Sequence, residues 1–211
     1  MVNTILAPSI LAYDNCDLLT AVKIIENSGA QWIHVDVMDG HFVDNVSFGP
    51  KLVADLRRHS DLFLDVHLML DRPDRHIVPF VQAGADALTI HREVTCDVGG
   101  LLGAIRDHGC LCGLAFNPET ALDFELVRLA DVVLLMGVHP GFCGQNFIAE
   151  TWHKILQLHN FRNGNKLSHK ISVDGGVRED IAKNLICAGV DIIISGSAFF
   201  SNPSAFKFCL N

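Results

Sequence analysis

Short apolar runs rich in Val, Ile and Leu recur about every 25 residues along this chain, and a helical pattern follows each of them. Such alternation indicates parallel βα units, because parallel strands need a crossover connection. Eight such units are the number in a closed barrel, so we predict one α/β domain, a (β/α)8 TIM barrel over residues 1–211, with a doubly wound open sheet as the alternative. The expected strands lie near 4–9, 32–37, 63–68, 86–91, 111–116, 131–137, 170–174 and 191–196. The expected helices lie near 15–28, 50–59, 73–84, 97–108, 119–129, 149–162, 178–188 and 203–209.

Glycine and proline mark the ends of these elements. The glycines that follow predicted helices, where a left-handed residue commonly ends a helix, are Gly29, Gly84, Gly109 and Gly189. The prolines at predicted first helical positions are Pro50, Pro73 and Pro203. Pro79 is expected to kink or split the helix at 73–84, and the last helix is short.

Composition excludes several classes of protein. Hydrophobic residues make up 49% of the chain, which suffices for a large core and argues against disorder. The net charge of −8 comes without a basic stripe and argues against a nucleic-acid partner. No apolar run is long enough to span a membrane, and the start of the sequence does not resemble a signal peptide, so we expect a cytoplasmic protein with no membrane partner.

The seven cysteines form no C-x-x-C pair, so we expect reduced and mostly buried thiols. The histidines on predicted helices and loops are expected at the surface: His59, His76, His108, His153, His159 and His169.

Acidic and imidazole side chains end three of the predicted strands. Alternate residues of a strand share a face, so His34 and Asp36 lie on one side of their strand, and Asp65 and His67 on one side of the next. Asp174 ends a third strand. A structural ion-pair network is the alternative, but the carboxyl ends of barrel strands form the active-site face of such enzymes.

We therefore predict that His34, Asp36, His67 and Asp174 hold one divalent metal ion per subunit and that either of the two carboxylates could move a proton. The mixed nitrogen and oxygen ligands suit zinc, manganese, iron(II) or cobalt. Asp65 could orient a ligand histidine or satisfy a core hydrogen bond. Methionines near strand ends, either core residues or an apolar rim of the site, are Met38, Met69 and Met136.

Three glycine-bearing turns follow the sixth, seventh and eighth strands: H-P-G-F-C-G-Q at 139–145, D-G-G-V at 174–177 and S-G-S-A at 195–198. Glycine lets backbone N–H groups approach a ligand closely, and such groups bind phosphate without lysine. These turns therefore predict a phosphate site, although three unrelated tight turns are the alternative.

With these residues identified, the chain resembles the ribulose-phosphate 3-epimerase family almost from end to end. The matching segments, in the family's order, run from A-P-S-I-L at 7–11 through H-V-D-V-M-D-G, D-V-H-L-M, P-G-F-x-G-Q and V-D-G-G-V to G-S-A-F-F at 196–200. The resemblance implies a barrel of the ribulose-phosphate-binding type that interconverts D-ribulose 5-phosphate and D-xylulose 5-phosphate. Asp36 and Asp174 would transfer protons through a metal-stabilised enediolate.

Other site residues are also implied by this resemblance. The residues expected to bind the sugar phosphate are Ser9, His67, Gly141, Phe142, Cys143, Gly144, Asp174, Gly175, Gly176, Gly196 and Ser197. The chain departs from the family's usual pattern at Asp44 in the expected lid loop 40–49, where proline is usual, and at His139 and Cys143 in the expected phosphate loop. We also expect a homo-oligomer.

Two other functions remain open at this point. One is 3-epimerisation of a hexulose phosphate such as D-allulose 6-phosphate, and the other is a non-catalytic barrel that binds metal or phosphate. A decarboxylase or aldolase of the same fold is disfavoured, because no lysine stands among the strand-end carboxylates.

Overall fold

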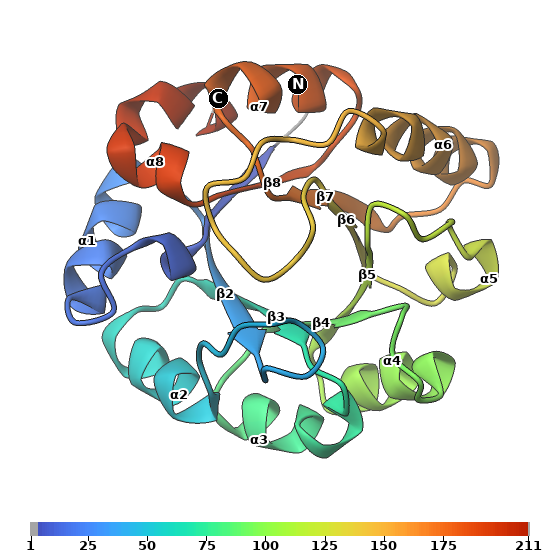
Figure 1. Cartoon of the computed structure of the whole chain (residues 1–211), viewed down its shortest axis with the longest axis horizontal. Helices are drawn as coiled ribbons and strands as arrows, with labels where there is room; N and C mark the ends of the chain where they lie inside the picture. Colours follow the sequence, from blue (N-terminus) through green and yellow to red (C-terminus); the bar gives the residue numbers. More distant parts are fainter. Residues whose placement is uncertain (1–3, 211) are drawn as a thin grey trace.

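Eight parallel strands form the centre of the protein in the computed structural model, which describes residues 4–210 (Figure 1). Residues 1–3 and 211 of the expected domain lie outside the described residues. The strands are β1 (Ile5–Pro8), β2 (Trp32–Met38), β3 (Phe63–Met69), β4 (Ala87–His91), β5 (Leu111–Phe116), β6 (Val132–Met136), β7 (Lys170–Asp174) and β8 (Ile192–Ser195). Each overlaps one predicted strand.

The strands follow one another around the sheet in the order β1-β8-β7-β6-β5-β4-β3-β2. The first and last members of this series meet at a parallel bridge between Ser9 and His34, which closes the sheet into a barrel. An open doubly wound sheet would leave two separated edges. The predicted (β/α)8 barrel is therefore confirmed.

Helices surround this barrel on all sides (Figure 1). The α-helices are α1 (Leu18–Ser28), α2 (Pro50–His59), α3 (Ile77–Gln82), α4 (Val98–Asp107), α5 (Phe124–Val127), α6 (Thr151–Gly164), α7 (Glu179–Cys187) and α8 (Ser197–Ser201). Three 3₁₀ helices lie at Ile10–Ala12, Pro73–Arg75 and Pro203–Leu210. The glycines expected after helices all have positive φ: Gly29, Gly84, Gly109 and Gly189.

Three predicted helices differ from the observed ones. The helix expected at 73–84 is split as expected, but the break lies at His76. Pro79 lies in the first turn of α3, where backbone N–H groups have no partner within the helix, so its missing N–H costs no hydrogen bond. The helix expected at 119–129 shrinks to α5, whose N-cap Asp123 accepts a hydrogen bond from the Leu126 N–H. The last expected helix is a 3₁₀ helix, and the short α8, which was not predicted, precedes it.

The inside of the barrel is divided into an apolar part and a polar part. The apolar part comes mainly from β1, β6 and β8 and consists largely of Ala7, Leu134, Met136, Ile192 and Ile194. The polar part comes from β2, β3, β4 and β7 and contains His34, Asp36, Asp65, His67, Thr89, His91, Ser172 and Asp174. A separate apolar core lies between the outside of the barrel and the helices. Burying polar side chains is unfavourable unless they are paired or bind a ligand, so apolar packing does not account for the polar part of the barrel.

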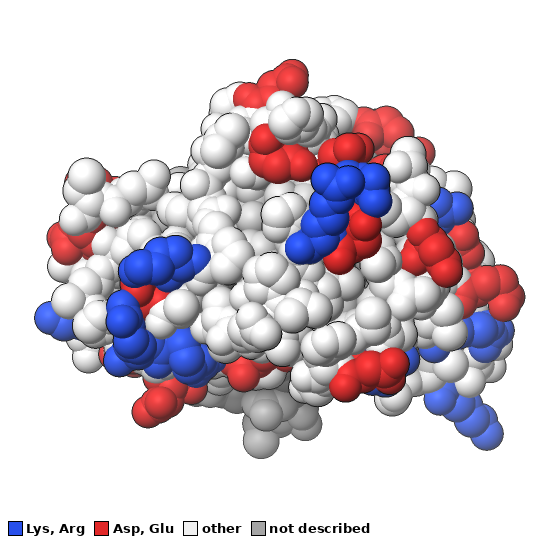
Figure 2. All heavy atoms as spheres, turned by 90° about the horizontal axis from the view of Figure 1, so that it is seen from below, with Lys and Arg blue, Asp and Glu red and all other residues white. Residues whose placement is uncertain are grey.

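On the face seen in Figure 2, the Lys and Arg side chains that the structure describes are interspersed with Asp and Glu, and no continuous basic surface forms there. Among residues 4–210, no helix is long and apolar enough to cross a membrane. The contacts described all lie within one chain, so the expected homo-oligomer stays a prediction.

Two expectations about burial are wrong. His169 is buried instead of exposed: it directly precedes β7, and its carbonyl accepts a hydrogen bond from Arg162. The seven thiols are free as expected, but fewer than half are buried: Cys110, Cys112 and Cys209.

Candidate active site

The four residues predicted to hold a metal ion come together at the carboxyl ends of three strands. His34 and Asp36 lie on β2, His67 on β3 and Asp174 on β7, each with its side chain inside the barrel. One ligand atom from each of the four lies within 4.8 Å of the others. Both imidazoles are fully buried, and the side chains of Asp36 and Asp174 are 5% and 14% exposed. The cluster thus offers two nitrogens and two carboxylates to one point.

Asp65 orients His34. It is the cross-strand partner of His34 in the β2–β3 register, and its Oδ2 lies 2.7 Å from His34 Nδ1. The other ring nitrogen, Nε2, therefore faces the cluster, 3.2 Å from Asp36 Oδ1 and 4.0 Å from Asp174 Oδ2. The sequence left two roles open to Asp65, orienting a ligand histidine or satisfying a core hydrogen bond. The contact with His34 on the neighbouring strand supports the first role.

His67 faces the cluster with its Nδ1, which lies 3.1 Å from Asp36 Oδ1. Its Nε2 lies 2.7 Å from Nε2 of His91, the last residue of β4, and His91 Nδ1 lies 3.1 Å from Glu93 Oε2. The sequence analysis missed His91 and Glu93. The signal was available, because H-R-E at 91–93 ends a predicted strand just as the other cluster residues do.

Electrostatic interactions separate the two carboxylates of the cluster. Burial alone would raise the pKa of Asp36, but the charge and hydrogen bond of His34 hold it below its usual value. Burial and then the negative charge of Asp36 raise the pKa of Asp174 to about 7. In the absence of an ion, Asp36 is therefore ionised and Asp174 holds a proton near neutral pH.

The pKa values of the imidazoles shift in opposite directions. Burial disfavours the charged form of His34, but the carboxylates of Asp36 and Asp65 outweigh it and raise the pKa of His34 well above its usual value. Burial lowers the pKa of His91 to about 4, so this ring is neutral at physiological pH.

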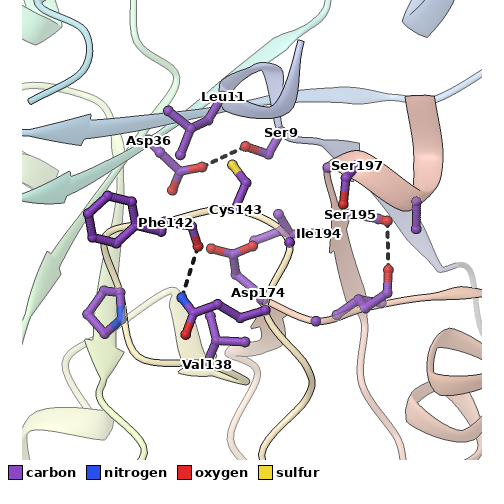
Figure 3. A pocket seen from close by; sticks show the side chains of 18 of the residues that line it. Ser9, Leu11, Asp36, Val138, Phe142, Cys143, Asp174, Ile194, Ser195 and Ser197 are labelled. Carbon is purple, nitrogen blue, oxygen red and sulfur yellow. Dashed lines mark hydrogen bonds between the residues drawn. The ribbon is translucent and has the colours of Figure 1, made fainter. Parts of the chain in front are cut away.

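A cavity of about 260 Å³ lies above the cluster at the mouth of the barrel (Figure 3). Asp36 and Asp174 point into it, and Ser9 donates a hydrogen bond from its Oγ to Asp36 Oδ2 over 2.6 Å. His34 and His67 lie beneath its floor. The methionines near the strand ends form part of its wall: Met38, Met69 and Met136.

Glycine-bearing loops form the other side of this cavity. All the remaining residues expected to bind the sugar phosphate line it: Gly141, Phe142, Cys143, Gly144, Gly175, Gly176, Gly196 and Ser197. Positive φ values occur at four of them, namely Gly141, Gly144, Gly175 and Gly176. A Cβ on Gly176 would come within 2.5 Å of the Phe147 backbone nitrogen, so the turn requires glycine for close backbone approach as well as for its φ of +68°.

The loop 40–49 is held in place despite aspartate at position 44. Ser47 donates a hydrogen bond from its Oγ to the Asp36 carbonyl over 2.6 Å, and Asn45 donates one to the Gly141 carbonyl over 2.7 Å. The expected lid therefore contacts the expected phosphate loop directly. Asp44 itself is exposed.

The two unusual residues of the 139–145 loop differ in their surroundings. His139 pairs with Glu119 over 3.1 Å at the surface. The Cys143 thiol lies at the cavity (Figure 3), where partial burial and the negative charges of Asp36 and Asp174 raise its pKa to about 11. This thiol is therefore protonated and poorly nucleophilic.

Comparison with known proteins supplies the context of this site. Residues 5–200 match the model of the ribulose-phosphate 3 epimerase family. The ribulose-phosphate 3-epimerase of Chlamydia muridarum is 44% identical over 204 residues, which cover 95% of this chain and 90% of that protein. The protein of the same name from Treponema pallidum is 44% identical, with 97% and 94% covered, and that from Bacillus subtilis 41%, with 95% and 94% covered.

Solved structures of low sequence identity share the fold. One mutant tryptophan synthase alpha-subunit from Pyrococcus furiosus superposes with a TM-score of 0.70 at 14% identity, covering 98% of this chain and 94% of the other. That likeness shows the barrel alone. The family model and the relatives together cover nearly all of the chain at high identity, so the chain is an enzyme of the ribulose-phosphate 3-epimerase family.

Proposed function

We propose that this enzyme interconverts D-ribulose 5-phosphate and D-xylulose 5-phosphate by inverting carbon 3. The observation that carries the proposal is the convergence of Asp36 and Asp174, from strands that are not neighbours, on one buried cluster below a glycine-lined cavity. Inverting a carbon next to a carbonyl requires a group that removes its proton on one face and a group that returns one on the other. Two carboxylates that reach one cavity from separate strands suit these tasks.

The residues of the cluster fit a divalent metal ion, and we propose that one is held by His34, Asp36, His67 and Asp174. Two imidazole nitrogens and two carboxylate oxygens within 4.8 Å form a donor set typical of zinc, manganese, iron(II) or cobalt. Burial and the charge of Asp36 both disfavour the ionised form of Asp174, and a cation between the two carboxylates would offset both effects. When bound, the ion would stabilise negative charge that develops on the substrate's oxygens.

Asp36 and Asp174 then exchange roles with the direction of reaction: one carboxylate takes the proton from carbon 3, and the other delivers a proton to the opposite face. Ser9 orients Asp36 through its 2.6 Å hydrogen bond. The methionine wall of the cavity keeps water from the reacting carbon. We propose that the phosphate lies against backbone amides of the glycine-bearing turns at 141–144, 175–176 and 196–197, which carry no charge to repel it.

Deuterium exchange tests this function. Purified protein and ribulose 5-phosphate in heavy water should give the xylulose isomer with deuterium at carbon 3 in the proton NMR spectrum. D-allulose 6-phosphate, tested beside it, should react more slowly. A protein that binds the sugar phosphate without exchanging the carbon 3 proton would instead be a binding protein, and the proposal would be rejected.

Gly176→Ala is expected to raise KM for the sugar phosphate on the order of tenfold, because a left-handed alanine costs roughly 1–2 kcal/mol and its Cβ displaces the Phe147 backbone. Metal affinity should stay unchanged, since Gly176 lies outside the cluster. Gly103→Ala in α4 is the matched control, because a Cβ there has nothing within 4 Å. Steady-state kinetics measure both, and an unchanged KM in Gly176→Ala would contradict the phosphate assignment.

A further inference from the structure

Two buried imidazoles and a partly buried carboxylate extend from the cluster away from the cavity. His67 Nε2 lies 2.7 Å from His91 Nε2, and His91 Nδ1 lies 3.1 Å from Glu93 Oε2. Both imidazoles are fully buried, and their rings stack with centroids 4.9 Å apart. Neither His91 nor Glu93 belongs to the group of possible metal ligands, and the proposed proton transfers do not use them.

The direction of these hydrogen bonds follows from Glu93 and from the proposed ion. A carboxylate only accepts hydrogen bonds, so His91 donates from its Nδ1 to Glu93. An ion on His67 Nδ1 leaves the proton of that ring on Nε2, so His91 has to accept on its own Nε2. His67 Nδ1 is left with a lone pair that faces Asp36 Oδ1 at 3.1 Å. Two lone pairs at this distance repel each other unless a cation lies between them.

We infer that Glu93, acting through His91, fixes His67 as the tautomer protonated at Nε2 and thereby sets the affinity of the cluster for a divalent ion. The inference rests on the metal site of the proposed function. His91 and Glu93 are positioning residues, because they act on the ion through a ligand and do not touch it.

The environment of Glu93 holds its carboxylate in a single orientation. Its Oε1 accepts a hydrogen bond from the Asn117 N–H over 2.7 Å, which leaves Oε2 for His91. Lys154 donates to the Asn117 carbonyl over 2.6 Å and so anchors the loop after β5. From the lid loop, the Phe42 ring packs on His91 with centroids 4.7 Å apart. A buried ring in such contact has no water to replace a lost acceptor.

Glu93→Gln tests the inference with little change in shape. Glutamine has one side-chain oxygen, so it cannot accept from both the Asn117 N–H and the His91 Nδ1–H. If its amide turns towards His91, that ring must accept on Nδ1, donate from Nε2 and oppose the Nε2–H of His67. Zinc affinity of the purified protein, measured by competition with a chelating dye, should fall about 10- to 100-fold.

Glu119→Gln is the matched control, because it removes the same charge from an exposed residue at the same end of the barrel. It should bind zinc as the wild type does. Wild-type affinity in Glu93→Gln, with zinc bound normally by the wild type, would overturn the inference alone. A wild-type protein that binds no divalent ion would overturn the proposed metal site as well.

Nitrogen-15 NMR of histidine-labelled protein gives a readout that loss of packing would not produce. His91, assigned by its loss in His91→Gln, should carry its proton on Nδ1 in both metal-free and zinc-loaded wild type. His67 in the zinc-loaded protein should be protonated at Nε2 with the metal on Nδ1. A wild-type His91 protonated at Nε2 would overturn the inference, even if Glu93→Gln failed to fold.

Discussion

Asp174→Asn is expected to abolish the interconversion of the two epimers while the barrel still folds. An amide transfers no proton to carbon 3, and losing one acid/base group costs about 100- to 10,000-fold in rate. The fold should survive because burial and the charge of Asp36 already favour the neutral form of Asp174, which asparagine imitates. Steady-state turnover and thermal unfolding measure the two effects.

Isotope exchange separates a lost proton transfer from a lost metal ion. With Asp36 intact, Asp174→Asn should still exchange the carbon 3 proton of one epimer with solvent, because Asp36 can remove a proton and return one to the same face. The other epimer should not exchange. If neither does and zinc affinity has also fallen, the variant has lost the ion, and Asp174 acts mainly as a ligand.

Asp36→Asn should be more damaging. Asp36 Oδ1 lies 3.2 Å from His34 and 3.1 Å from His67, and its Oδ2 accepts from Ser9, so the amide disturbs three contacts and loses the base. Zinc affinity and turnover should therefore fall together. Asp107→Asn, exposed at the end of α4, is a control for the loss of one charge. Near-normal turnover by either cluster variant would reject the two-carboxylate assignment.

The residues of the cluster could be predicted because the pattern that places each of them lies within a single strand. In β2, alternation alone places His34 and Asp36 on one face, and a barrel brings the carboxyl end of every strand to the same mouth. The partner of His34 was not predictable in this way. Asp65 reaches it through the β2–β3 register, in which His34 faces Asp65 and Asp36 faces His67. Register between separate strands is a tertiary property that the pattern within each strand does not contain.

The segment 117–122 shows why one helix was predicted too long. Its sequence tolerates a helix, but Lys154 donates to the Asn117 carbonyl and Glu93 accepts from the Asn117 N–H, which commits this backbone to a loop. Tertiary contacts therefore override local propensity at this point. The same loop anchors Glu93 through the Asn117 N–H.

Removing divalent ions with a chelator is expected to abolish turnover, and adding zinc, manganese, iron(II) or cobalt should restore it to different extents. Without a cation the buried cluster holds two carboxylates and two imidazoles that no described lysine or arginine pairs with, and the substrate's oxygens lose the charge that would stabilise them. Inactivation of this kind should reverse, because the apolar part of the barrel and the outer core hold the fold. Full turnover after exhaustive chelation, with metal analysis showing none left, would reject the metal site.

Metal affinity should also depend on pH through Asp174. Its pKa in the metal-free protein is about 7 instead of the usual 3.8, so below pH 7 the native protein holds a proton that a bound ion must displace. Lowering the pH from 7 to 5 should weaken zinc binding by about an additional tenfold per pH unit, and above pH 7 this contribution should vanish. Calorimetry in buffers of different ionisation enthalpy counts the protons released. Asp174→Asn should release about one proton fewer at pH 6, and an equal count in both proteins would show that Asp174 is ionised before the ion binds.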